Sequence, residues 1–399
     1  MLIRELTVDD VDASLRASRD AFGGPLPDRS TFKFGNGLRR WGIFDGSTLA
    51  AKAVEREYTS MIGGREICTA GAAGVLVSPE YRGRGLAREV MTHLLAQARE
   101  RGAAISTLFR TAPALYRSLG YEQVAELCAA ALPTAALRGL RVRTPITVRR
   151  ATVADVPLIR AVYAAVVAEG SCLLTRTGPS FGGSDQDLLD SFDGITLALD
   201  ANGLVSGYAS WNRGEKWGPE GVLAVSEIHA NDAASAEGLL AVIGSFDAVA
   251  PKLTFRTSGN DPIHWLIPGA GWATTDVRQY MLRVVDLVGA VAQRGWPPGV
   301  TATVDFTVAD RVCPWNAGSH RLVLNDGSGR LEPGSSTRPE PGAGSGIHIG
   351  PRGLAVLIAG GSTPAAMRRA GLLVGGSPDD DRILGAAMAG PRPAILDFF

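Results

Sequence analysis

A hydrophobic period of four residues predicts one long amphipathic helix. The apolar residues of this period are Leu86, Val90, Leu94 and Ala98. Polar residues fill the other faces, and Gly102 ends the pattern, as glycine commonly does after a helix. The preceding stretch from Gly71 to Val77 is small and apolar, and Ser78-Pro79 closes it. The segment from Val75 to Arg101 is therefore predicted to form a strand, a loop and a helix.

The pattern at the start of the chain returns near residue 148. Ile3 to Val11 and Val148 to Val156 both place a short strand before a Thr-Val turn, after which an Asp caps an amphipathic helix. Chance similarity is the alternative, but recurrence at two expected domain starts favours duplication. The stretch from Leu132 to Thr147 holds two prolines and three arginines and is interpreted as a linker. We therefore expect one module over residues 1–143 and a second over residues 144–284.

The last third of the chain has a different pattern and is expected to form a third domain over residues 285–399. Val300 to Val308 alternates with period two, and Ile347 to Ala359 is also strand-like. Residues 325–350 are rich in Gly, Ser and Pro and are interpreted as loops between strands. Helices are expected to start at Pro364 and after Ser377. The chain ends on an apolar segment, which suggests that its terminus is packed inside the protein.

Composition narrows the functional classes. The chain has 399 residues, of which 45% are hydrophobic and 20% charged, and Lys+Arg and Asp+Glu balance at 40 each. Length predicts two or three globular domains, and neutrality argues against nucleic-acid or membrane partners. The N-terminal residues do not form a signal peptide, so a cytoplasmic location is expected. The cysteines and histidines lack metal-ligand spacing, and no metal is expected.

The loop before the predicted helix has the composition of an anion cradle. Glu80-Tyr81-Arg82-Gly83-Arg84-Gly85-Leu86-Ala87 places glycines and arginines directly at a helix start. Glycines let the backbone approach a pyrophosphate, and the first helical amides and the helix dipole favour negative charge. Arg82 and Arg84 add charge-assisted hydrogen bonds. A basic surface turn is the alternative interpretation.

This segment resembles motif A of the GNAT superfamily of N-acetyltransferases, in which a strand precedes Arg/Gln-x-x-Gly-x-Gly/Ala and a helix. Arg82, Gly85 and Ala87 occupy its three defined places. Leu115 to Tyr121 also resembles the family's Phe-Tyr-x-x-x-Gly-Phe helix end. The resemblance implies acetyl-CoA as co-substrate, and it implies Tyr116 as the acid that protonates the leaving thiolate; a core aromatic is the alternative. The implied coenzyme contacts are Val75, Leu76, Val77, Arg82, Gly83, Arg84, Gly85, Leu86, Ala87, Arg88, Thr111 and Ala112.

The whole chain resembles the Eis (enhanced intracellular survival) family of actinobacterial acetyltransferases. That resemblance implies an α+β protein with two tandem GNAT folds, mixed central sheets flanked by helices, and a sterol-carrier-like domain. The second module lacks a counterpart of Arg82 to Ala87 and is expected to bind no coenzyme. In this family the terminal carboxylate enters the first domain's site as general base, which implies that role for Phe399; a hydrophobic anchor for the last segment is the alternative. An alkyl ammonium has a pKa of about 10 and must lose a proton before it attacks a thioester.

The resemblance also implies a substrate class and an assembly. It implies primary amines of aminoglycosides, lysine-like small molecules or peptides, and a hexamer. Candidate substrate contacts are Phe22, Trp41 and Asp397. Some relatives carry an acidic residue directly before the final phenylalanine, whereas this chain has Phe398 there, which puts drug specificity in doubt. A lipid-binding carrier with a vestigial acetyltransferase domain and a coenzyme-A-responsive regulator are the competing hypotheses.

Overall fold

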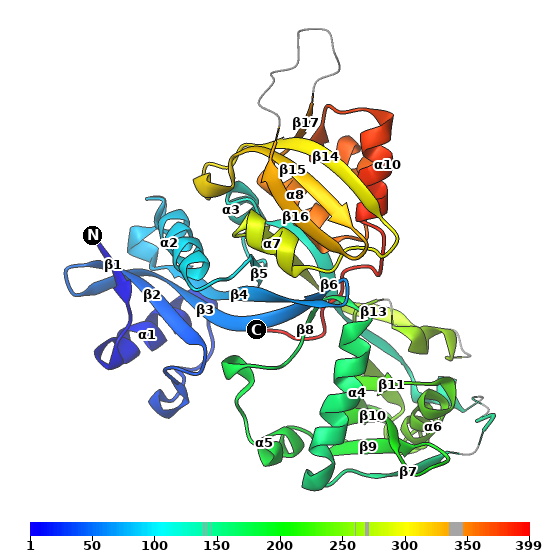
Figure 1. The fold of residues 1–399 in the computed structure, drawn as a ribbon. Helices are drawn as coiled ribbons and strands as arrows, with labels where there is room; N and C mark the ends of the chain where they lie inside the picture. The colour runs from blue at the N-terminus through cyan, green and yellow to red at the C-terminus, as the bar shows by residue number, and fades with distance from the viewer. Residues whose placement is uncertain (139, 141, 145, 260, 268–270, 335–345) are drawn as a thin grey trace.

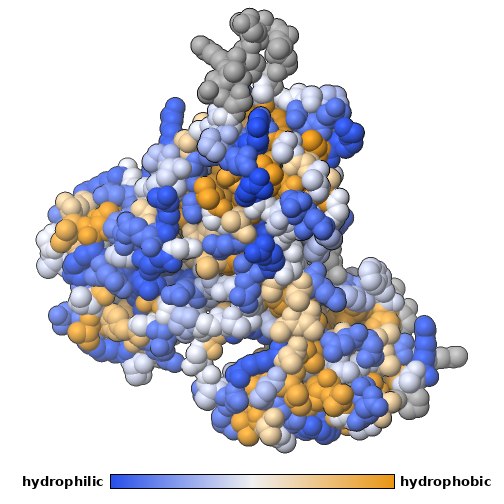
Figure 2. Space-filling model, viewed as in Figure 1, coloured by the Kyte–Doolittle hydropathy of each residue, from blue (hydrophilic) through white to orange (hydrophobic). Residues whose placement is uncertain are grey.

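Two β-sheets organise the chain in the computed structural model, which describes all residues except 139, 141, 145, 260, 268–270 and 335–345. Among the described residues, a 13-stranded sheet occupies the first two thirds of the chain and a five-stranded sheet the last third. We call β1 to β6 with their helices the first half, β7 to β13 the second half, and the remainder the third domain. Figure 1 shows the second half as a green lobe, and Figure 2 shows the surface hollowed between this lobe and the rest.

The first half carries helices on both faces of its sheet. Its strands are β1 (Leu2–Glu5), β2 (Leu38–Asp45), β3 (Thr48–Ile62), β4 (Arg65–Val77), β5 (Ile105–Phe109) and β6 (Glu122–Pro133), and its helices are α1 (Val11–Phe22), α2 (Leu86–Glu100) and α3 (Pro113–Ser118). Lys52 of β3 donates to Ser14 of α1 at 2.7 Å, whereas Glu55 of β3 pairs with Arg101 at the end of α2. Because side chains alternate along a strand, α1 and α2 cover opposite faces.

The second half repeats the start of the first half in atomic detail. Its strands are β7 (Thr147–Arg150), β8 (Ser171–Leu174), β9 (Gly194–Leu199), β10 (Val205–Asn212), β11 (Val222–Ala230), β12 (Lys252–Thr257) and β13 (Ala273–Val284), and its helices are α4 (Val156–Ala168), α5 (Asp185–Asp190) and α6 (Ala233–Gly244). Arg4 binds Asp10 through two hydrogen bonds of 2.6 and 2.8 Å, and Arg149 binds Asp155 through two of 2.7 Å. These guanidinium groups hold the pKa of both carboxyls below the usual range. The matching pairs support the duplication inferred from sequence.

The third domain confirms some predicted elements and corrects others. Its strands are β14 (Thr301–Val308), β15 (Gly318–Asn325), β16 (Ser328–Pro333), β17 (Ile347–Ile349) and β18 (Leu373–Val374), and its helices are α7 (Leu287–Gln293), α8 (Pro351–Ala359), α9 (Pro364–Arg369) and α10 (Pro378–Ala387). The helix starts at Pro364 and Pro378 are confirmed, since Thr363 and Ser377 cap them.

Three sequence-based expectations were wrong in part. The strand-like stretch from Ile347 to Ala359 forms a strand only to Ile349, because Pro351 starts α8, whose buried residues follow a helical period. The expected loop region 325–350 contains β16, and its residues 335–345 lie outside the described residues. The expected linker begins too early, since Leu132 and Pro133 belong to β6; residues 139, 141 and 145 within it are not described.

The two halves exchange their last strands. β13 of the second half lies between β5 and β6 of the first, and β6 in turn lies between β13 and β12. All three contacts are antiparallel ladders, with Tyr280 opposite Phe109 and Thr254 opposite Ala131. Removal of either strand would leave two unpaired sheet edges. One continuous sheet therefore joins the halves across the expected boundary at residue 143.

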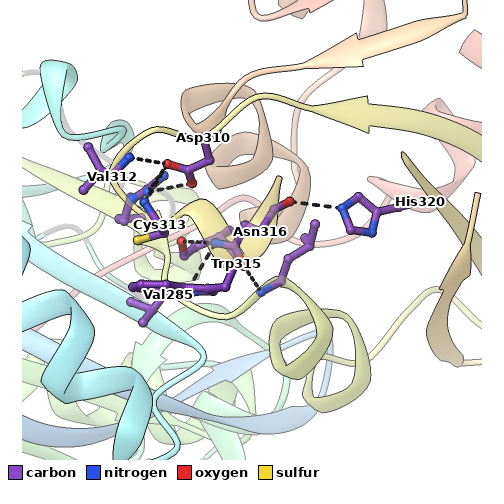
Figure 3. A network of polar contacts seen from close by, with 10 residues as sticks. Val285, Asp310, Val312, Cys313, Trp315, Asn316 and His320 are labelled. Carbon is purple, nitrogen blue, oxygen red and sulfur yellow. Dashed lines mark hydrogen bonds and ion pairs between the residues drawn. The ribbon is translucent and has the colours of Figure 1, made fainter. Parts of the chain in front are cut away.

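The third domain docks on β13 through the segment from Asp310 to Asn316 (Figure 3). Trp315 Nε1 donates to the Val285 carbonyl at 2.7 Å, and the Asn316 amide donates to the same carbonyl at 3.1 Å. Asn316 also accepts the backbone N–H of Leu287 at 2.9 Å, and its carbonyl lies 3.0 Å from His320 Nε2. These contacts join the end of the second half to the third domain.

A buried ion pair completes this junction. Arg283 of β13 donates to both oxygens of Asp310 at 2.7 and 2.8 Å, and the two side chains are 0% and 1% exposed. Asp310 also accepts the backbone N–H groups of Val312 and Cys313 (Figure 3). Because removal of one partner leaves a charge without compensation in the protein interior, this pair is expected to be indispensable.

Asp310→Ala should therefore lower the free energy of unfolding by about 3–5 kcal/mol, because Arg283 stays buried without a counterion. Chemical denaturation followed by circular dichroism measures the change. Asp379→Ala is the matched control, since Asp379 pairs with Arg382 in an ion pair that is 82% and 73% exposed. Equal stability of the two variants would contradict the assigned importance of the Arg283–Asp310 pair.

Candidate active site

Strands β4 and β5 separate in the first half. They pair in parallel from Thr69 opposite Ile105 to Gly71 opposite Thr107. β4 then continues to Val77, and over this extension its described ladder partners lie on β3 only. The backbone of Val75 to Val77 consequently keeps hydrogen-bonding groups on the side that faces away from β3. Such groups can hold an extended amide-containing ligand in the manner of an added strand.

The loop after β4 is open at the start of α2. Gly83 and Gly85 adopt φ values of 78° and 80°, which favour glycine, and a Cβ at either residue would meet no atom within 4 Å. The first turn of α2 has no side-chain cap, so its amides are available to an anion. Arg82 and Arg84 are exposed beside the loop and donate to the carbonyls of Val77 and Glu80. This arrangement fits the pyrophosphate of a coenzyme.

Among the described residues of the second half, no loop corresponds to this one. β11 ends at Ala230 and α6 begins at Ala233, so two residues replace the connection from Ser78 to Gly85. Asp232 caps α6 and accepts the N–H of Ser235 at 2.8 Å. A carboxylate at this helix start occupies the amides and repels phosphate.

Tyr116 lies on α3, directly after the end of β5. Its ring is 4% exposed, belongs to a cluster with Ala72 and Leu108, and lies 6.1 Å from the ring of Tyr121. Burial raises the pKa of the Tyr116 phenol above its ordinary value, and the Thr111 side chain acts in the opposite direction. The phenol therefore keeps its proton at neutral pH. Thr111 and Ala112 are exposed in the turn between β5 and α3.

Phe399 packs where β4 and β5 separate. Its ring lies 4.9 Å from the ring of Tyr58 on β3 and 5.6 Å from that of Phe109 at the end of β5. A Cβ at Gly71 would stand 2.6 Å from the ring of Tyr58 and 2.9 Å from a ring carbon of Phe399, so these two rings together leave room only for glycine. The end of the chain thus reaches the first half, beside β3 and β8 (Figure 1).

A buried polar network holds the residues just before Phe399. Arg176 Nε donates to Asp397 at 2.9 Å, and the same guanidinium pairs with Glu227 of β11. Burial raises the pKa of Asp397, although Arg176 opposes this effect. Burial also acts to raise the pKa of Glu227, but the attraction of Arg176 prevails and lowers it to about 2. Asp397, predicted as a substrate contact, is thus engaged within the protein.

The other predicted substrate residues do not gather around Phe399. Trp41 is buried against α2, with its ring 4.7 Å from His93, on the sheet face opposite α1. Phe22 ends α1 and is 57% exposed. Sequence reasoning did not identify Tyr58, Gly71, Arg176 and Glu227 as site residues, because each acts through contacts with residues far away in the sequence. Among the described residues, no group of side chains is arranged to hold a metal ion, and no helix is long and apolar enough to span a membrane.

Comparisons with known proteins place these features in context. Family profiles described as an acetyltransferase (GNAT) domain match residues 2–124 and 184–284, and one described as a sterol carrier protein domain matches residues 287–396. The crystal structure of a GCN5-related N-acetyltransferase from Kribbella flavida is 31% identical, covers 100% of this chain and 98% of its own, and has a TM-score of 0.84. That of Eis1 from Mycobacterium abscessus is 18% identical with full coverage of both chains and a TM-score of 0.78, a likeness of fold.

A sequence relative agrees with the structural matches. An uncharacterised N-acetyltransferase from Streptomyces coelicolor is 28% identical over 74% of this chain and 72% of its own length. Together the matches confirm the predicted fold class: two successive GNAT folds with mixed sheets flanked by helices, followed by a sterol-carrier-like domain.

Gly85→Ala should raise the KM for acetyl-CoA about tenfold or more, because the added Cβ stands where a phosphate must approach the amides. Gly102→Ala is the matched control at the other end of α2, since Gly102 also has a positive φ, 88°, and open space around a Cβ. Both variants carry a similar backbone strain of about 1–2 kcal/mol. Steady-state kinetics at saturating amine compares the two variants. An equal KM for acetyl-CoA in both would contradict the assignment of this loop as the pyrophosphate-binding site.

Proposed function

This chain belongs to the GCN5-related N-acetyltransferases, whose fold implies acetyl-CoA as co-substrate, and we propose that it acetylates a primary amine where β4 and β5 separate. One observation carries this assignment of the site. The open glycine loop, the buried phenol of Tyr116 and the terminal residue Phe399 all flank the same pair of strands. These groups come from distant parts of the sequence, and each has a distinct use in acyl transfer.

In the proposed reaction the amine nitrogen forms a bond to the thioester carbonyl carbon as the carbon–sulfur bond breaks. The amides of the glycine loop, with Arg82 and Arg84, bind the pyrophosphate, and the free backbone of Val75 to Val77 orients the pantetheine arm. The carboxylate of Phe399 accepts the proton of the ammonium, directly or through water, which makes the nitrogen a nucleophile. Tyr116 donates its proton to the leaving sulfur, and the phenolate that results takes up the second proton, which the nitrogen loses as the amide forms. The high pKa of the phenol suits this role, because it stays protonated until it is needed.

We extend the proposal to an Eis-type enzyme that acts on small-molecule or peptide amines, including lysine-like and aminoglycoside-type polycations. The sequence resemblance and the position of the chain end in the first half support this assignment. The same resemblance supports assembly as a homohexamer. Acetylation of an amine panel, followed by release of free thiol from acetyl-CoA, tests the activity. Tight lipid binding without turnover of any amine would instead favour the carrier hypothesis.

Tyr116→Phe should lower kcat by about 10²- to 10⁴-fold, the usual effect of a lost general acid or base. The ring stays in its cluster, so the melting temperature should change little. Since burial raises the pKa of the phenol, wild-type activity should show no alkaline limb from this group below about pH 10. The rate of thiol release, measured across pH, gives both kcat and its pH dependence. A kcat within threefold of wild type would exclude Tyr116 as the acid.

An extension of two residues, Gly-Ser, after Phe399 should lower kcat about tenfold or more, because the reacting carboxylate moves away from the site. The same extension before Met1 is the control, since Met1 is 60% exposed and far from these residues in the sequence. Thiol release compares the two proteins. Equal activity of the two extended proteins would show that the terminal carboxylate is not the base.

A further inference from the structure

The residues after α10, 388–399, have little regular structure of their own, yet they are held closely. We call them the tail. Pro393 forms a single parallel bridge with Ser171 of β8, and the N–H of Ala394 donates to the Ser171 carbonyl at 2.8 Å. Ile395 is fully buried and Leu396 is 6% exposed. Because chain ends usually fray, such burial indicates that the tail has a defined place.

One guanidinium group organises the polar contacts of the tail. Arg176 follows β8 and donates its Nε to Asp397 while its terminal nitrogen pairs with Glu227. Its planar head lies 4.0 Å above the ring of Tyr163 on α4. Arg176 has a φ of 57°, a conformation that costs a non-glycine residue free energy. A strained backbone at a residue that makes two ion pairs indicates that the surroundings impose this geometry.

Two buried tyrosines contact the carboxylates of this network. The Tyr208 hydroxyl donates to Glu227 at 2.6 Å, and the Tyr163 hydroxyl lies 3.3 Å from Asp397 and 2.8 Å from the Leu174 carbonyl. The side chain of Leu396 packs into the same cluster as both tyrosine rings. Because its members are joined by hydrogen bonds and packed against apolar side chains, the network is expected to hold the tail in one place.

This network occupies the place in the second half that corresponds to the active site of the first. β11 and β12 pair in parallel only from Val222 to Val225, as β4 and β5 pair only to Gly71. Glu227 is the second residue beyond the last pair. The duplicated fold therefore uses the separation of its strands twice, once beside the candidate active site and once to bind the tail.

We propose that Arg176 and Glu227 of the second half are positioning residues for acetyl transfer, acting through Asp397 to hold the terminal carboxylate at the active site. The proposal rests on the proposed role of Phe399. Asp397 is two residues from the terminus, and two residues span at most about 7 Å, so a fixed Asp397 restricts the carboxylate to a small volume. Such restriction converts a mobile base into an oriented one, an effect expressed in kcat.

Arg176→Gln and Asp397→Asn should each lower kcat about tenfold or more and leave the KM for acetyl-CoA within about twofold. Asp397→Asn lies in the tail and should not disturb folding, which keeps the test valid if Arg176→Gln is unstable. Arg149→Gln is the matched control, because it removes an Arg–Asp pair of the same half that does not touch the tail. A kcat within twofold of wild type for Asp397→Asn would overturn the proposal.

Carboxypeptidase A, which removes C-terminal aromatic residues, tests the anchor without reference to activity. Free phenylalanine should appear at least about tenfold faster from Arg176→Gln and Asp397→Asn than from wild type or Arg149→Gln, since release of the tail exposes the terminus. Equal rates of phenylalanine release in all four proteins would show that Arg176 and Asp397 do not hold the tail in place.

Combination of each variant with the Gly-Ser extension separates the two proposals. If the network acts through the terminal carboxylate, Arg176→Gln should lower kcat no further in the extended protein. A loss that multiplies in the double variant would show that Arg176 acts by another route. Full activity of the extended wild type would contradict the role of the Phe399 carboxylate as base, and with it the positioning role of Arg176 and Glu227. The carboxypeptidase result would still decide whether the network anchors the tail.

Discussion

Strand β13 lies between β5 and β6, and its two ladders of backbone hydrogen bonds join the halves of the protein into one sheet. The β6–β12 ladder adds a second connection between the halves. The pairing of β13 fixes the angle and register between the halves, so that β8 can pair with β3 and the tail can pass between them. It also presents Arg283 to Asp310, which fastens the third domain. A shift of one residue in these ladders would reverse the side chains of β13 and separate that pair.

The two halves show how one fold diverges in its electrostatics. In the first half, glycines with positive φ leave the amides of α2 open, and arginines stand beside them. In the second half, Asp232 takes the corresponding helix start, and Glu227 stands beyond the strand separation. A phosphate would meet charge of its own sign from Asp232 at this helix start. The two halves thus differ in a few polar residues at this helix start, whereas both keep the Arg–Asp pair near their first strand.

Sequence alone revealed the local part of the site and little of the rest. The strand, loop and helix around Arg82 to Ala87 were predictable because one periodic segment contains them, and the start of α9 was predictable because its cap and proline are adjacent. Trp41 was predicted to contact the substrate. The face of the sheet on which a strand residue lies depends on strand register, however, and the register places Trp41 against α2. Arg176 carried no signal, since its partners come from β11 and the tail. α8 was mistaken for a strand because a short apolar run fits both patterns, and only Pro351 distinguishes them.

The exchange of strands also sets a requirement on how this chain folds. β5 ends at Phe109, whereas its neighbour in the sheet begins only at Ala273. During synthesis the first half must therefore wait, with the edges of β5 and β6 exposed, until most of the second half has left the ribosome. Contacts between such distant segments slow folding, and open edges favour association with other chains in the meantime. The strand order that joins the two halves in one continuous sheet thus leaves unpaired strand edges on the nascent chain until β13 has been synthesised.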